Sequence, residues 1–99
     1  MVLTRQNLSN TLQDVFDEYE CSKSVINKDY CPNGLQVQGS DQVIVVVTGV
    51  SASMDLINHA IKIKADAIIV HHGYFWKGEP EVITGMKKNR VKALLDNNI

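Results

Sequence analysis

Two adjacent histidines, His71 and His72, are the residues of this 99-residue chain best suited to chemistry. They follow an apolar run that ends at residue 70 and precede an aromatic loop that begins and ends with glycine, 73–78. Neutral imidazole is the commonest side-chain metal ligand. Neighbouring side chains on a strand point to opposite faces, but the backbone turns at a strand end. Two such imidazoles can therefore serve one metal ion each, and the pair predicts a metal site. The alternative is two polar residues that merely close a strand.

The loop after the histidines contains Tyr74, Phe75 and Trp76, and two interpretations of these rings remain open. Aromatic rings can stack on nucleobases and so form a substrate platform. They can also plug a core or a subunit interface, and this second interpretation is favoured because aromatic side chains bury a large area wherever they lie. Lys77 could reach an anionic substrate, and Glu79 could reach a metal-bound water.

The other polar candidates have weaker support. Asn33 lies in a Pro-Asn-Gly turn, where it either faces the metal site or simply serves the turn. His59 is expected on the surface of a helix. Four basic residues near the carboxyl end could hold phosphates, but a solvated helix face is favoured because the net charge of −1 leaves no strong positive field. These are Lys87, Lys88, Arg90 and Lys92.

The elements that must position the histidines form a β-α-β pattern. The run of β-branched residues at 43–47 predicts a strand buried on both faces, as in a parallel sheet, and it should end within 48–51. Ser53 is suited to cap a helix over 54–64. A second buried strand is expected over 67–70. Such a unit is right-handed and parallel, and open α/β sheets bind ligands at the carboxyl ends of their strands.

Other elements flank this unit. An amphipathic helix is predicted over 5–20 with Thr4 as its N-cap, and its apolar stripe is Leu8, Leu12, Val15, Phe16 and Tyr19. Residues 35–38 alternate apolar and polar, as in a short half-buried strand. A last helix is expected over 84–97, with Val91, Leu94 and Leu95 on one face. It should lead to a third strand, so the sequence looks truncated.

Composition narrows the class of protein. Ninety-nine residues allow one small domain, and an apolar fraction of 44% is ordinary for a globular core. The net charge of −1 argues against a general role at nucleic acids or membrane surfaces. No segment reads as a signal peptide or a membrane span. Cys21 and Cys31 read as free thiols, so a cytoplasmic location is expected.

Three blocks of sequence match a known family in order and spacing. They are Tyr-Cys-Pro-Asn-Gly-Leu-Gln-Val at 30–37, Thr-Gly-Val at 48–50 and Ala-Asp-Ala-Ile-Ile-Val-His-His-Gly-Tyr-Phe-Trp-Lys-Gly at 65–78. With them, essentially all 99 residues closely resemble the amino-terminal part of the GTP cyclohydrolase 1 type 2 homologue family, also called NIF-three-like. Cys31 is a departure, because Ala is more usual there.

The resemblance implies an α/β fold in which residues 1–99 are the amino-terminal portion of a longer NIF-three-like domain, with a mixed or parallel sheet flanked by helices. It implies two divalent ions per subunit, with His71 and His72 as the first ligand of each and the other ligands beyond residue 99. Zn, Mn, Fe and Ni all suit mixed His and carboxylate ligation. A ring-shaped homo-oligomer such as a hexamer is also implied. No catalytic residue is assigned.

Three classes of function are compared. Metal-assisted hydrolysis is favoured, with a purine nucleotide such as GTP as the small-molecule substrate that the family name suggests. A metal-binding scaffold or metallochaperone that interacts with partner proteins is the alternative, and turnover would distinguish the two. A nucleotide-binding module without metal is disfavoured, because the chain has neither a Gly-x-Gly-x-x-Gly nor a Gly-x4-Gly-Lys-Ser/Thr motif.

Overall fold

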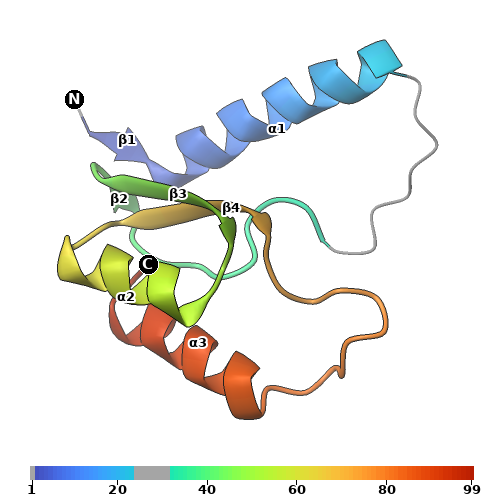
Figure 1. Ribbon diagram of the computed structural model, residues 1–99. Helices are drawn as coiled ribbons and strands as arrows, with labels where there is room; N and C mark the ends of the chain where they lie inside the picture. Colours follow the sequence, from blue (N-terminus) through green and yellow to red (C-terminus); the bar gives the residue numbers. More distant parts are fainter. Residues whose placement is uncertain (1, 24–31) are drawn as a thin grey trace.

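The computed structural model describes residues 2–23 and 32–99, which form an α/β arrangement as expected. The elements in chain order are β1 (Leu3–Thr4), α1 (Arg5–Lys23), β2 (Gln42–Val43), β3 (Val46–Ser51), α2 (Met54–Lys62), β4 (Ala67–His72) and α3 (Gly85–Asp96). Figure 1 shows α2 and α3 on one side of the β3–β4 pair and α1 on the other. Within these ranges no helix is both long and apolar enough to cross a membrane. The side chain of Cys21 and all of Cys31 lie outside the described residues, so the free thiols stay a prediction.

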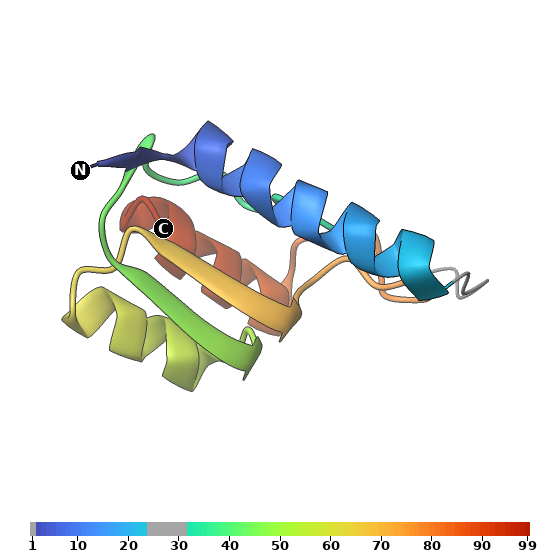
Figure 2. The same cartoon turned by 90° about the horizontal axis from the view of Figure 1, so that it is seen from above.

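The predicted β-α-β unit is confirmed. β3 and β4 pair in parallel, from Val46 opposite Ala67 to Ser51 opposite His72, and Figure 2 shows the two strands side by side. The helix between them, α2, begins after Ser53, whose hydroxyl oxygen accepts a hydrogen bond of 3.2 Å from the backbone N–H of Leu56. This is the N-cap predicted from sequence. The unit therefore brings the carboxyl ends of both strands to the same edge.

The prediction of one strand over 43–47, buried on both faces, is wrong. The run is divided between β2 and β3, and Ile44 in its middle is 71% exposed. The carboxylate of Asp66 accepts hydrogen bonds from the backbone N–H of Ile44 (2.9 Å) and of Val45 (3.0 Å), so a side chain replaces the sheet partner there. β3 instead continues through 48–51, which was expected to end it, because β4 supplies pairing partners along that stretch.

The amino-terminal helix begins where it was predicted. The hydroxyl oxygen of Thr4 accepts a hydrogen bond of 3.0 Å from the backbone N–H of Asn7, as an N-cap does. Arg5 then anchors the helix to the segment before β2. Its guanidinium donates to the carbonyl of Gly39 at 2.8 Å and lies 2.9 Å from the carboxylate of Asp41.

The apolar stripe predicted for α1 has little cover from the described part of the chain. Leu8 and Leu12 are half-buried, whereas Val15 is 55% exposed. The side chains of Phe16 and Tyr19, which complete the predicted stripe, lie outside the described residues. In Figure 1, α1 extends well away from the helices that cover the other side of the sheet.

The segment 35–38 forms no strand, contrary to the prediction. Leu35 is 55% exposed, while Val37 packs against the core cluster. The side chain of Gln36, and not the backbone of this segment, makes the pairing contacts. Alternation of apolar and polar residues is therefore present without the backbone ladder that it usually accompanies.

The core lies between the β3–β4 pair and the helices α2 and α3. Ile57 and Ala60 of α2 are fully buried. The final helix agrees with the predicted 84–97 to within a residue, but Leu95 is 54% exposed although it was expected to share the buried face. It follows Leu94 directly, so it lies about 100° further round the helix. The core cluster is Val47, Ala52, Ile57, Ala60, Ala65, Tyr74, Leu94 and Ile99.

Candidate metal centre

The two predicted metal ligands are the last two residues of β4. Both His71 and His72 are exposed, and the centroids of their imidazole rings are 4.4 Å apart with the ring planes at 47°. The backbone carbonyl of His72 accepts a hydrogen bond of 3.0 Å from the N–H of Ala52, which directly follows β3. The strand end that carries the imidazoles is therefore held against the neighbouring strand, while the rings remain open to solvent.

The aromatic loop divides into one buried ring and two exposed rings. Tyr74 is only 6% exposed, and its hydroxyl donates a hydrogen bond of 2.9 Å to the carbonyl of Ala52. Burial raises the pKa of the Tyr74 hydroxyl, although the charge of Arg90 acts in the opposite direction. Phe75 and Trp76 are each 37% exposed. The favoured interpretation as a core plug is thus confirmed for Tyr74 alone.

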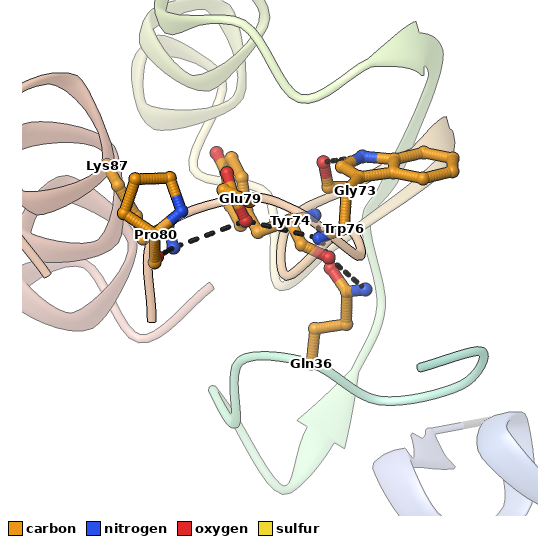
Figure 3. A network of polar contacts seen from close by, with 7 residues as sticks. All are labelled: Gln36, Gly73, Tyr74, Trp76, Glu79, Pro80 and Lys87. Carbon is orange, nitrogen blue, oxygen red and sulfur yellow. Dashed lines mark hydrogen bonds and ion pairs between the residues drawn. The ribbon is translucent and has the colours of Figure 1, made fainter. Parts of the chain in front are cut away.

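Trp76 lies beside the histidine pair, as its position in the sequence suggested. Its indole ring meets the imidazole of His72 edge-on, with the ring centroids 5.6 Å apart. The indole N–H donates a hydrogen bond of 3.1 Å to the carbonyl of Gly73, which fixes the ring over the start of its own loop (Figure 3). A planar, partly exposed ring therefore borders the two imidazoles.

Glu79 closes the loop and does not extend as a free carboxylate. It accepts a hydrogen bond of 3.1 Å from the backbone N–H of Trp76, and its own N–H donates to the Trp76 carbonyl at 2.9 Å. Partial burial raises the pKa of Glu79. Hydrogen bonds from Lys87 and from the backbone of Phe75 and Trp76 lower it by more, so the pKa lies below its ordinary value. The predicted role of Glu79 at a metal-bound water therefore has a competing structural explanation.

Lys87 is the cation that faces Glu79, and the prediction of a solvated side chain is wrong for it. Its side chain is only 10% exposed, and Nζ lies 3.2 Å from the Glu79 carboxylate. Nζ also donates to the carbonyl of Pro80 at 2.9 Å and lies 5.2 Å from the centroid of the Phe75 ring. Phe75 itself has a φ of +66°. The start of α3 is thereby tied to the aromatic loop (Figure 3).

The remaining candidates take more ordinary positions. His59 is exposed on α2, as predicted, and Lys77 and Asn33 are exposed. The turn that contains Asn33 has Gly34 at a φ of +104°, which explains the glycine. The other basic residues of α3 keep the solvated character expected of them, except that Arg90 is half-buried. The exposed pair is Lys88 and Lys92.

Gln36 is a residue of the site that the sequence did not reveal. Its amide oxygen accepts a hydrogen bond of 2.8 Å from the N–H of Tyr74, and its amide nitrogen donates to the carbonyl of Tyr74 at 2.9 Å (Figure 3). The same nitrogen donates to the carbonyl of Pro32 at 3.0 Å. The sequence offers one clue to this role, because a side-chain amide can donate and accept hydrogen bonds at once. It does not indicate the partner, since Tyr74 lies 38 residues away.

The sequence model of the family described as Duf34/NIF3 (NGG1p interacting factor 3) matches residues 7–99 of this chain. The chain belongs to the Duf34/NIF3 family. The resemblance inferred from the three sequence blocks is thus confirmed. A Vibrio cholerae protein named GTP cyclohydrolase 1 type 2 homolog is 62% identical over 72 residues, which are 73% of this chain and 29% of that protein.

Two solved structures have the same fold. One, titled as the structural-genomics protein ybgI of unknown function, has a TM-score of 0.76 and 52% identity, and the match covers 92% of this chain and 36% of that one. The other, TTHA1606 from Thermus thermophilus, has a TM-score of 0.79 and 34% identity, with 98% and 38% covered. The chain therefore spans between 29% and 38% of the length of these three proteins.

The donors present in this Duf34/NIF3 chain fit part of a metal centre. Two exposed imidazoles stand at the carboxyl end of a parallel strand, and nitrogen donors of this kind suit several divalent transition metals. Across residues 2–23 and 32–99, however, no group of three or more His, Cys, Asp or Glu side chains is arranged to hold an ion. A metal centre built on this pair would need further donors.

Proposed function

We propose that the intact protein binds two divalent metal ions and acts as a metal-dependent hydrolase on a nucleotide or a related small molecule. His71 and His72 would each hold one ion. The observation that supports this most directly is the exposed pair of imidazoles, 4.4 Å apart between centroids, at the strand edge where α/β proteins bind ligands. Paired metal ions in hydrolytic sites are about 3.5–4 Å apart, so neighbouring side chains can hold one ion each.

The ions would supply the chemistry of such a centre, and the chain would hold their ligands in position. Two ions held by His71, His72 and further ligands would polarise a substrate oxygen and lower the pKa of a bound water. The described residues hold the pair in place, because Ala52 fixes the His72 carbonyl and Tyr74 fills the core directly behind the strand end. The further ligands would come from elsewhere in the intact protein, and Zn, Mn, Fe and Ni remain the candidate metals.

Two observations support a nucleotide as the class of substrate. Relatives carry the name GTP cyclohydrolase 1 type 2 homolog, which favours a purine nucleotide. The exposed ring of Trp76 beside His72 offers a surface on which a planar base could stack. A ring-shaped homo-oligomer such as a hexamer, in the cytoplasm, completes the proposal.

Elemental analysis of the purified intact protein, followed by a screen of nucleotide hydrolysis, tests the proposal. We expect about two equivalents of metal per subunit and product formation that stops on chelation and returns with metal. The double variant His71→Ala/His72→Ala should lose both metal and activity. Metal content of two equivalents without turnover of any nucleotide or ester would favour the alternative, a metal-binding scaffold or metallochaperone. Absence of metal would refute both.

A further inference from the structure

We propose that Gln36 is a positioning residue of the metal centre, which acts on the histidine pair through the backbone of Tyr74. The inference rests on the proposed function, since it concerns the same two imidazoles. Gln36 belongs to a loop that is distant in sequence from β4, and its side chain is nonetheless half-buried beside the strand end. Its hydrogen bonds go to the backbone of Pro32 and Tyr74 rather than to an imidazole, so its action would be indirect.

The side chain of Gln36 pairs with both backbone hydrogen-bonding groups of Tyr74. The Gln36 amide satisfies both the N–H of Tyr74 (2.8 Å) and its carbonyl (2.9 Å), as a neighbouring strand would. The amide nitrogen also bonds to the carbonyl of Pro32, which ties the pairing to the Pro-Asn-Gly turn. The sheet thus gains a side-chain partner two residues beyond the last residue of β4.

Gly73 shows how closely the amide approaches the backbone. A Cβ atom placed on Gly73 would collide with the amide oxygen of Gln36, and would lie 3.0 Å from its amide carbon. The φ of Gly73 is not among the positive values that would by themselves require glycine. A side chain at residue 73, between His72 and Tyr74, would therefore have to displace the Gln36 amide from its hydrogen bonds to Tyr74.

The pairing sets the direction of the chain as it leaves the metal ligands. His72 is held on its other side by Ala52, and Tyr74 is held by Gln36 at the backbone and by Ala52 at the hydroxyl. Because only Gly73 separates these anchors, rotation of the backbone after His72 is restricted. Groups that orient metal ligands in this way commonly affect metal affinity by about 10–100-fold.

The test compares three variants of the intact protein. Gln36→Met keeps the length of the side chain and removes all of its hydrogen bonds. Gln36→Glu keeps an acceptor for the N–H of Tyr74 and removes the donor to the two carbonyls. Gln38→Met is the matched control, because Gln38 is exposed on the same segment. Each is examined by Zn²⁺ titration calorimetry, thermal unfolding and hydrogen–deuterium exchange of peptides that cover 71–77.

We expect Gln36→Met to weaken Zn²⁺ binding by at least about tenfold and to speed exchange of the Tyr74 amide by a similar factor. In Gln36→Glu the exchange rate of the Tyr74 amide should lie between the rates of the wild type and of Gln36→Met. Gln38→Met should match the wild type. A lower unfolding temperature for Gln36→Met with unchanged Zn²⁺ affinity would overturn the inference, since it would show a purely structural role. Unchanged exchange at Tyr74 would overturn it as well.

The two proposals fail in distinguishable ways. If the wild type binds Zn²⁺ and Gln36→Met binds it equally well, only the positioning role is lost. If the wild type binds no divalent metal, the proposed function is lost and the positioning role with it. A wild type that binds Zn²⁺ and a Gln36→Met variant that binds it weakly at an unchanged unfolding temperature would support the positioning role and the metal binding on which it rests.

Discussion

The hydroxyl of Tyr74 donates a hydrogen bond of 2.9 Å to the backbone carbonyl of Ala52, and the N–H of Ala52 donates at 3.0 Å to the carbonyl of His72. Ala52 thus binds the chain on both sides of Gly73. This relationship joins the ends of the two parallel strands to the aromatic loop. It explains how two exposed imidazoles can occupy a fixed place, because the residues directly before and after Gly73 are anchored to one neighbour.

Tyr74→Phe should therefore destabilise the protein modestly. It removes one buried hydrogen bond and leaves the Ala52 carbonyl without it, which typically costs about 0.5–1.5 kcal/mol. Tyr74→Ala should cost more, about 3–5 kcal/mol, because it also removes the buried ring. Denaturant unfolding monitored by circular dichroism measures both. Equal stability of Tyr74→Phe and the wild type would show that the hydrogen bond contributes nothing.

Replacement of His71 or His72 by Ala should each remove about one equivalent of metal from the intact protein, if each serves one ion of a pair. The fold should survive, because both side chains are exposed. His59→Ala is the matched control, since His59 is the third histidine of the chain and lies exposed on α2. Unchanged metal content in both single variants, measured by elemental analysis, would contradict the assignment.

Residues 1–99 expressed alone should bind metal weakly and catalyse nothing. Zinc sites use at least three protein ligands, and no such group is present in the described ranges 2–23 and 32–99. Isothermal titration of the 99-residue chain measures this. Tight stoichiometric binding would mean that a local carboxylate such as Glu79 leaves Lys87 and completes the site.

Trp76 should report on metal binding. Its ring centroid lies 5.6 Å from that of His72, and it is the only tryptophan of the chain. Addition of Cu²⁺ or Ni²⁺ to the metal-free intact protein, with any other tryptophan replaced by Phe, should lower its emission. The double variant His71→Ala/His72→Ala should lose this response. Equal quenching in that variant would place the ion elsewhere.

Asp66 should make stability depend on acidic pH. Hydrogen bonds from the backbone N–H of Val45 and of Ile44 lower the pKa of the carboxyl below its ordinary value of 3.8 in the folded state. A carboxyl whose pKa falls on folding stabilises fully above its unfolded pKa, and this is lost as pH falls through the folded pKa. The advantage of the wild type over Asp66→Asn should thus be complete near neutral pH and shrink below about pH 3.8.

Urea unfolding at neutral and acidic pH measures this difference. The exposed carboxylate of Glu81 offers a control, Glu81→Gln, for general effects of a lost negative charge. If Asp66→Asn and the wild type differ by the same free energy at every pH, the charge of Asp66 has no part in holding the two N–H groups.

Features set by neighbouring residues could be predicted from the sequence. The Ser53 cap joins residues three apart, and the helix that follows buries Ile57 and Ala60 through the ordinary helical period. The strand over 67–70 was also found, and it extends to the histidines, but its residues are half-buried and not buried as predicted. For the cap and the helix the determining contacts are local, so the pattern of residue types contains the information.

Features set by distant partners could not be predicted. The apolar run at 43–47 reads as one buried strand, but a single carboxylate at Asp66 takes two of its N–H groups. The segment 35–38 reads as a strand, but the Gln36 side chain does the pairing with Tyr74. Lys87 reads as solvated until Glu79 and the Phe75 ring are brought to it by the fold.

The conformation of Phe75 limits the amino acids that its position can accept. With a φ of +66°, the backbone is left-handed, which β-branched residues adopt only with strain and which glycine and asparagine adopt readily. Natural variation at residue 75 should therefore admit Gly or Asn and exclude Val, Ile and Thr. In a library of all substitutions at this codon, the variants lost should be those whose side chains disfavour a left-handed backbone, more than those that are less hydrophobic. In the printed sequence the position nevertheless looks like an ordinary aromatic one.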